Sequence, residues 1–164
     1  MKSLRFLNIV LGTLLLCALT TQVQAKDKEK PLEYSIQSAG SANQGYYLVE
    51  VSAMVDKAKQ VSEDIVLKCA VHGVLFRGFA AAQGGTAQRP LAGSAMQEMQ
   101  HKEFYDAFFQ NGSYKSYATF VNGSMKTTRV GKQFKVTGIV SVAKEQLRRD
   151  LEKAGMIKGL SSGF

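Results

Sequence analysis

The first 25 residues limit what the rest of the chain can fold into, because they are typical of a segment that is removed. Lys2 and Arg5 form a short basic start, residues 9–19 are uncharged and almost wholly apolar, and residues 23–25 read Val-Gln-Ala. These are the parts of a bacterial secretory signal peptide. The apolar run has eleven residues, whereas a membrane-spanning helix needs roughly 20. We therefore predict export, cleavage after Ala25, and no transmembrane segment in the mature chain.

Cleavage after Ala25 leaves 139 residues with a single cysteine, Cys69. One cysteine cannot form an intramolecular disulfide, so the fold must be stabilised by packing. Cys17 raises an alternative in which the cysteine is acylated and anchors a lipoprotein to a membrane. The residue before it is Leu16, and a lipoprotein signal favours a small residue there, so ordinary cleavage is the preferred interpretation. Either route predicts a location in the periplasm or at the outer membrane.

Hydrophobic periodicity divides the mature chain into a leader and one domain. Residues 26–45 contain a charged leader and a short first strand, and residues 46–164 form a single α+β domain with a loop at 80–95. Alternation at period two predicts strands, and apolar residues three or four apart predict helices. In chain order, the pattern predicts a strand at 46–55, a helix at 57–72 that Gly73 ends, a strand at 74–79, a helix at 96–110, strands at 114–121 and within 127–142, and a helix at 143–154.

The order of these elements predicts a two-layer sandwich, with a mixed or antiparallel sheet and helices packed on one face. Asn122-Gly123 is the strongest hairpin signal in the chain. The helical spacing also predicts two buried stripes, one of Met96, Met99, Phe104 and Phe108 and one of Leu147, Leu151 and Ala154.

The segment at 80–95 is rich in alanine and glycine and carries one charge, Arg89. It has little apolar area to bury, so we expect a long mobile loop. Loops of this length inside compact domains are often functional, although a tolerated surface insertion explains the composition equally well. Because Gly84 and Gly85 let another backbone approach closely, we expect the segment to order on contact with a partner.

One pair of residues has the spacing of a catalytic site. Ser141 and Lys144 are three residues apart directly after a predicted strand, and in some hydrolases such a lysine acts as the base for the serine. Only 20 residues follow Lys144, which leaves no room for the further motifs of those enzymes. A capping role for Ser141 at the start of the last helix is the preferred interpretation.

Cys69 and His72 fall on one face of a predicted helix and, with His101, could begin a metal site or a thiol–imidazole pair. Structural zinc needs four closely spaced ligands, and the sequence offers no second pair. Cys69 lies on the apolar stripe, so we expect a core residue and His72 near the helix end. The sequence predicts no metal and no cofactor.

Two further features concern charged partners. Arg77-Gly78-Phe79-Ala80 matches the first half of an RNA-recognition motif, but the residues that follow lack the stacking aromatics, so no nucleic acid is expected. The C-terminal third is rich in lysine and arginine, including Arg148, Arg149 and Lys153. Such a surface suits anionic lipid, an envelope polymer or an acidic partner, and it also suits a solvated helix face.

The sequence Lys-Cys-Ala-Val-His-Gly-Val-Leu-Phe-Arg-Gly-Phe at 68–79 follows a Gly-Tyr-Tyr-Leu-Val-Glu-Val strand. Together these residues resemble a group of small uncharacterised exported envelope proteins of Gram-negative bacteria, associated with curli-type export systems. The resemblance covers about a fifth of the chain and includes no catalytic motif. It implies an accessory role in the envelope and transfers no site residues.

The sequence therefore predicts a non-enzymatic exported protein that binds an envelope protein or its own copies, as an accessory or subunit of an outer-membrane assembly or export system. The alternatives are a module that binds an anionic envelope polymer or lipid and, less favoured, a small Ser–Lys hydrolase. The residues expected to contact a partner are Gly84, Gly85, Arg89, Arg148, Arg149 and Lys153.

Overall fold

The structure is a computed structural model that describes residues 32–159. The predicted signal peptide, with Cys17, and residues 26–31 of the charged leader lie outside the described residues. The described elements are β1 (Tyr34–Ser38), β2 (Tyr47–Val55), the 3₁₀ turn η1 (Ala58–Gln60), α2 (Glu63–Phe76), α3 (Met96–Gln100), α4 (Lys102–Gln110), the 3₁₀ turn η2 (Ser113–Tyr117), β3 (Ala118–Phe120), β4 (Lys126–Val130), β5 (Gln133–Val142) and α5 (Lys144–Lys153).

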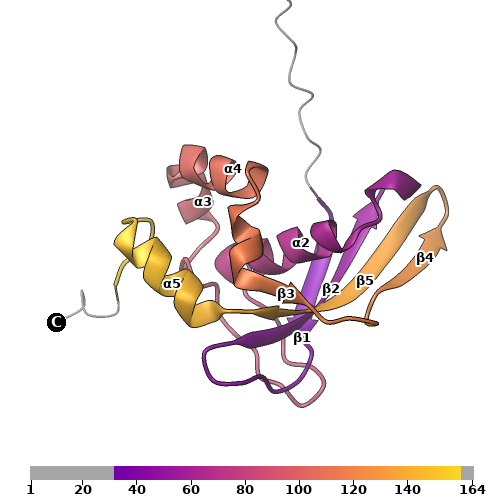
Figure 1. The fold of residues 1–164 in the computed structure, drawn as a ribbon, viewed down its shortest axis with the longest axis horizontal. Helices are drawn as coiled ribbons and strands as arrows, with labels where there is room; N and C mark the ends of the chain where they lie inside the picture. The colour runs from indigo at the N-terminus through magenta and orange to yellow at the C-terminus, as the bar shows by residue number, and fades with distance from the viewer. Residues whose placement is uncertain (1–31, 160–164) are drawn as a thin grey trace, which may run out of the picture. The chain divides into compact units, whose positions relative to one another are not determined.

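The strands form one antiparallel sheet in the order β1-β2-β5-β3, and β4 also pairs with β5 (Figure 1). The predicted α+β class is confirmed. The longest pairing joins β2 to β5, from Tyr47 opposite Val142 to Val55 opposite Phe134. β1 pairs with β2 along its whole length, so the sheet begins before residue 46.

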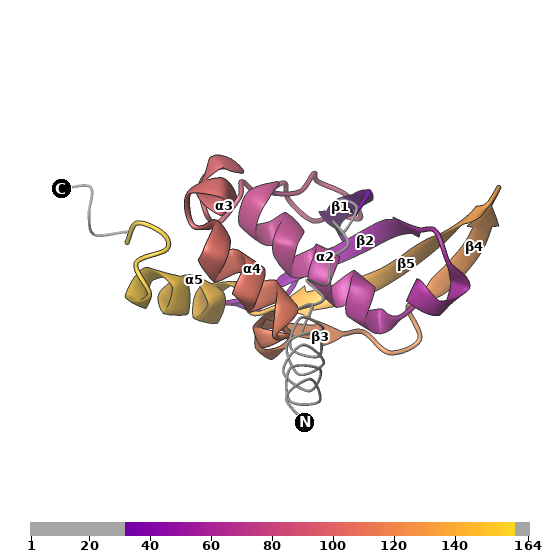
Figure 2. The ribbon, with the colours of Figure 1, turned by 90° about the horizontal axis from the view of Figure 1, so that it is seen from above.

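Alternation along the central strands separates a buried face from an open one. The buried face packs against α2, which lies across the sheet (Figures 1 and 2). On the opposite face Ser52 and Thr137 share a hydrogen bond of 2.9 Å between their hydroxyl oxygens, and no helix of the described chain covers this face. The buried face is formed by Val49, Val51, Ala53, Val55, Val136, Val140 and Val142.

The helix α2 begins and ends later than predicted, at Glu63–Phe76 in place of 57–72, and the strand predicted at 74–79 is wrong. Gly73 does not end the helix; its missing side chain lets β1 approach, since a Cβ there would lie 2.8 Å from Ile36 Cδ1. The helix instead ends at Phe76, and Gly78, the residue after its C-cap, has a left-handed φ of +67° and donates its N–H to the carbonyl of Gly73 at 2.9 Å. Glycine is the usual residue at this position after a helix.

The predicted hairpin at Asn122-Gly123 is also wrong. The turn forms, with Ser124 N–H donating to the Val121 carbonyl, but β3 and β4 on either side of it both pair with β5. They are two pieces of one interrupted edge strand. The β4–β5 hairpin turns instead at Gly131-Lys132, where the φ of Gly131 is +62°.

The helix predicted at 96–110 is broken at His101, whose φ and ψ of −116° and 35° are not helical. The break separates α3 from α4, so the predicted common stripe is lost. Met96 and Met99 are 65% and 79% exposed, whereas Phe108 is buried as expected. Tyr105, which the pattern did not single out, is buried instead.

The last helix, α5, matches its prediction closely. Leu147 and Leu151 are buried, although Ala154 is exposed. Gly155, with a φ of +71°, follows the helix end. Among the described residues, no helix combines the length and apolar character that crossing a bilayer would require.

Candidate functional site

Both ends of the segment 80–95 are fixed by backbone hydrogen bonds. Phe79 and Gln88 exchange two of them, at 3.0 and 2.9 Å, and the carbonyl of Ala80 accepts from the N–H of Ser38 on the edge of β1 at 2.9 Å. The N–H groups of Leu91 and Ala92 donate to the last turn of α2. The segment predicted to be a mobile loop is therefore anchored to β1 and α2 in the structure.

Gly85 is held where no larger residue fits. A Cβ at this position would lie 1.8 Å from Ser38 Oγ and 2.8 Å from the carbonyl oxygen of Gly40. Ser38 is 2% exposed, and its hydroxyl is fixed by donating to the Gly40 carbonyl and accepting from the Gly40 N–H, both at 3.2 Å. The β1–β2 loop and the tip of the segment therefore touch through backbone and small side chains.

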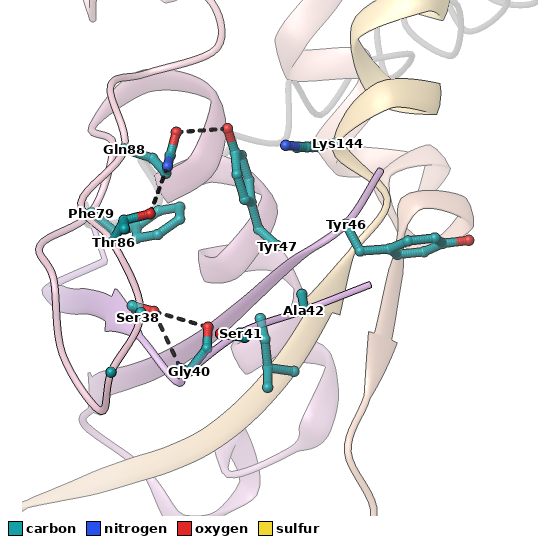
Figure 3. Close-up of a pocket in the computed structure, with 13 residues that line it drawn as sticks. Ser38, Gly40, Ser41, Ala42, Tyr46, Tyr47, Phe79, Thr86, Gln88 and Lys144 are labelled. Carbon is teal, nitrogen blue, oxygen red and sulfur yellow. Dashed lines mark hydrogen bonds between the residues drawn. The ribbon is translucent and has the colours of Figure 1, made fainter. Parts of the chain in front are cut away.

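A pocket of about 240 Å³ lies between these two loops and the first residue of α5 (Figure 3). We call it the Tyr47 pocket. The Tyr47 hydroxyl donates to Gln88 Oε1 at 3.0 Å, and Gln88 Nε2 donates to Thr86 Oγ1 at 3.1 Å. The Tyr47 ring meets Phe79 edge-on with centroids 5.1 Å apart. These contacts fix the orientation of the polar groups on the pocket wall.

The electrostatics of the Tyr47 pocket favour a negative ligand. Its one charged lining residue is Lys144, whose Nζ lies 4.5 Å from the centre of the Tyr47 ring. Burial raises the pKa of Tyr47, against an opposing effect of Arg148, so its hydroxyl stays a neutral donor at physiological pH. The other polar lining residues are Ser38, Ser41, Tyr46, Thr86 and Gln88. A carboxylate would meet one cation, Lys144, and the hydroxyls of Ser41 and Thr86 here.

The six predicted contact residues are not brought together. Gly84 and Gly85 line the Tyr47 pocket, whereas Arg89 is exposed outside its lining. Arg148 lines a second cavity of about 680 Å³, between residues 90–101 and the end of α5. Arg149 and Lys153 are exposed on α5.

The face of α5 is less basic than its lysines and arginines suggest. Arg148 Nη1 lies 3.5 Å from Glu152 Oε1, an ion pair within the helix. Glu145 and Asp150 place further carboxylates on the same ten residues. Of the other cations after residue 120, four lie on the β4–β5 hairpin, at the other end of β5, and Lys158 follows α5.

Ser141 and Lys144 are also separated. Ser141 lies within β5 opposite Leu48 and Thr119, on the face of the sheet away from α2. The ammonium of Lys144 lies instead over Tyr47. The predicted capping role of Ser141 is wrong, because the residue before α5 is Ala143. The structure forms no Ser–Lys pair.

Cys69 is a core residue, as predicted. It is 1% exposed, and burial raises the pKa of its thiol to about 12, so it is not a thiolate at neutral pH. Among residues 32–159, no group of acidic, histidine or cysteine side chains has the arrangement of a metal site. Phe79 of the RNA-like motif is also buried.

His72 joins three elements through a chain of hydrogen bonds that the sequence did not suggest. Its Nδ1 lies 2.5 Å from the Tyr34 hydroxyl, and its Nε2 lies 3.0 Å from Glu98 Oε1. Burial lowers the pKa of His72. The carboxylate of Glu98 partly offsets this lowering, and the positive charges of Arg77 and Lys68 add to it. Neutral His72 can accept from Tyr34 and donate to Glu98, which links β1, α2 and α3.

This arrangement predicts that stability falls in mild acid. The unfolded chain takes up a proton on His72 at the ordinary histidine pKa of about 6.5, whereas the folded chain does so only at a lower pH. The free energy of unfolding should therefore fall as the pH drops below about 6.5 and level off below the folded pKa. Urea unfolding at pH 7.5 and 5.5 should show this loss in the wild type and in His101→Gln. If His72→Gln lost as much stability between pH 7.5 and 5.5 as the wild type, His72 would not be the group responsible.

Comparisons of the chain with protein-family models, with curated proteins and with solved structures found no match. The interpretation of the Tyr47 pocket therefore depends on its geometry and charge.

The sequence predicted Gly84 and Gly85 as site residues but did not indicate that Tyr47, Gln88 and Lys144 belong to the same site. The sequence did hold a signal, because Lys144 follows one predicted strand and another predicted strand begins with Tyr46 and Tyr47. Only the pairing of β2 with β5 shows that these residues lie close together.

Proposed function

We propose that this chain is a non-enzymatic protein of the bacterial cell envelope, exported by a cleaved signal peptide, that binds a partner protein through the Tyr47 pocket. The observation that carries the proposal is the single cation, Lys144, among neutral hydroxyl and amide groups in a small pocket. The protein then serves in the periplasm or at the outer membrane as an accessory or subunit of an outer-membrane assembly or export system.

The size of the pocket supports a partner side chain or chain end as the group that enters it. Sites for drug-sized ligands occupy roughly 300–1,000 Å³, and this pocket has about 240 Å³. A partner's aspartate, glutamate or C-terminal carboxylate fits that volume and meets Lys144. The rim is formed by small residues, Ser41, Ala42, Gly84 and Gly85, which let a partner backbone come close.

The lining of the pocket lacks three residue types that commonly carry acid–base or nucleophilic catalysis. It includes no cysteine, histidine or carboxylate, and burial keeps Tyr47 protonated. These features favour binding over catalysis at this site. Binding of an anionic polymer or lipid through α5 is less well supported, because carboxylates alternate with the cations of that helix.

Recovery of the tagged protein from mildly solubilised envelopes of its own bacterium, after chemical crosslinking, tests the proposal. We expect a mature chain whose mass corresponds to a start at Lys26, crosslinked reproducibly to one other envelope protein. A second copy of this chain as the crosslinked product would assign the partner role to self-association. A free monomer in every preparation, or an untrimmed chain in the cytosol, would contradict the proposal.

A further inference from the structure

The outer edge of β3 and β4 is an open strand edge. Both strands pair with β5 on one side, and in the described part of the chain no strand pairs with their other side. Every residue of β4 is exposed, and the strand lies at the margin of the sheet (Figures 1 and 2). An open edge presents unpaired N–H and C=O groups that can pair with another chain.

The opposite edge of the sheet, formed by β1, is partly covered by the chain itself. The backbone of Ala80 bridges to Gln37 of β1 and accepts a hydrogen bond from Ser38, so the chain covers part of that edge itself. Natural sheets commonly protect an edge with proline, a bulge or charge. Residues 118–135 contain no proline, and the protection of β4 consists of its cations and the interruption at 121–125.

The charge of this edge is of one sign. No aspartate or glutamate occurs between Asp106 and Glu145 in the sequence. The β4–β5 hairpin carries four cations, and within residues 32–159 none of them forms an ion pair. Asp56, which directly follows β2, accepts a hydrogen bond from Gln133 of β5. The four cations are Lys126, Arg129, Lys132 and Lys135.

The register places these cations on both faces of the edge. Lys126 lies opposite Thr137, on the open face of the sheet, and Arg129 lies opposite Phe134, on the face toward α2. The hairpin turn has positive φ only at its first residue, Gly131, as in a type II′ turn. Residues flanking such a turn form a hydrogen-bonded pair, so alternation directs the N–H groups of Thr127 and Arg129 outward.

We propose that the outer edge of β3 and β4 binds an extended acidic segment of a partner protein, which adds to the sheet as a further strand. The outward backbone groups of Thr127 and Arg129 supply the main-chain hydrogen bonds, as in other complexes formed by strand addition. Lys126 and Arg129 select acidic side chains on the two faces of the added strand. Charge complementarity therefore sets which strand binds.

The β4 part of this surface, which carries Thr127 and the cations, is separate from the Tyr47 pocket. The hairpin lies at the start of β5 and Lys144 follows its end, and ten strand residues span roughly 30 Å. The edge can therefore be tested with variants that leave the pocket unchanged. Failure of one proposal does not imply failure of the other.

A capped peptide of sequence Thr-Glu-Val-Glu-Glu-Val-Thr, which carries glutamates on both faces of an extended strand, is titrated into the ¹⁵N-labelled protein to test the edge. We expect amide shift changes confined to 118–130 and slowed hydrogen exchange at Thr127 and Arg129. Thr127→Pro removes one outward N–H without breaking the pairing with β5 and should abolish binding while the protein stays folded. Lys126→Glu with Arg129→Glu should weaken binding at least about tenfold, and the matched pair Arg149→Glu with Lys153→Glu should not.

Two further probes separate strand addition from attraction to any polyanion. The first is Thr-Glu-Pro-Glu-Glu-Pro-Thr, which has the same charge and cannot form a regular strand. The second is a vesicle of phosphatidylglycerol. The proposal requires that neither probe binds in a way that depends on Thr127. The proposal is overturned if the strand-forming peptide does not bind, or if the proline peptide binds with the same affinity. It is also overturned if the charge reversals weaken the binding of vesicles and leave the binding of the strand-forming peptide unchanged.

Discussion

Replacing Gly78 with alanine should destabilise the protein by about 3 kcal/mol and dismantle the Tyr47 pocket. The φ of Gly78 is +67°, and a Cβ there would lie 2.3 Å from the carbonyl oxygen of Gln88. A left-handed conformation costs an alanine roughly 1–2 kcal/mol, and overpacking against backbone adds about 1–3 kcal/mol. The displaced Gln88 is also the hydrogen-bond acceptor of Tyr47, so the pocket wall should move with it.

Gly155 supplies a matched control for this substitution. It follows α5 as Gly78 follows α2, its φ is +71°, and nothing lies within 4 Å of the Cβ position. Gly155→Ala should therefore cost only the conformational term of about 1 kcal/mol. Urea unfolding at 25 °C measures both free energies. Equal losses in the two variants would show that the close approach of Gln88 to Gly78 does not stabilise the fold.

Replacing Lys144 with glutamate should weaken binding of the partner protein at least about tenfold. A hydrogen bond to a charged group contributes about 1.5–3 kcal/mol, and charge reversal adds repulsion of the partner's carboxylate. The same change removes the contact of the ammonium with the Tyr47 ring, worth about 1 kcal/mol of stability at this partly buried site. Titration calorimetry with the purified partner measures the affinity, and urea unfolding measures the loss of stability separately.

Two variants of α5 separate the pocket charge from general electrostatics. Lys144→Arg keeps the cation and should bind within about threefold of the wild type, since long-range charge is unchanged. Arg149→Glu makes the same change of net charge as Lys144→Glu, at an exposed position outside the lining of the pocket, and should also have little effect. Equal losses for Lys144→Glu and Arg149→Glu would contradict a specific role for Lys144.

The sequence predicted the elements whose periodicity extends over many residues. The alternation around Val49 and Val51 predicted β2, and the spacing of Leu147 and Leu151 predicted α5, because each pattern reports one continuous buried face. Shorter signals failed where tertiary contacts decided the outcome. A glycine such as Gly73 commonly ends a helix, but here it lies inside α2 and lets Ile36 of β1 pack closely against the helix. Only the folded structure distinguishes these two roles.

The Tyr47 pocket was predictable only in part. The unusual run of small residues indicated Gly84 and Gly85 directly from composition. The spacing of Lys144 from Ser141 predicted instead a catalytic pair. That prediction failed because Ser141 lies on the face of the sheet away from α2, whereas Lys144 contacts Tyr47. The pocket joins residues near 40, 85 and 144, and no local pattern reports contacts over such sequence separations.

Site-specific photocrosslinking tests the central claim, that a partner protein docks at the Tyr47 pocket, most directly. A photoreactive residue at Thr86, which is exposed at the pocket, would be compared in living cells with one at Gln110, exposed at the end of α4. We predict a reproducible adduct with one envelope protein from Thr86 and none from Gln110. No adduct from Thr86, or the same adducts from both positions, would contradict the account.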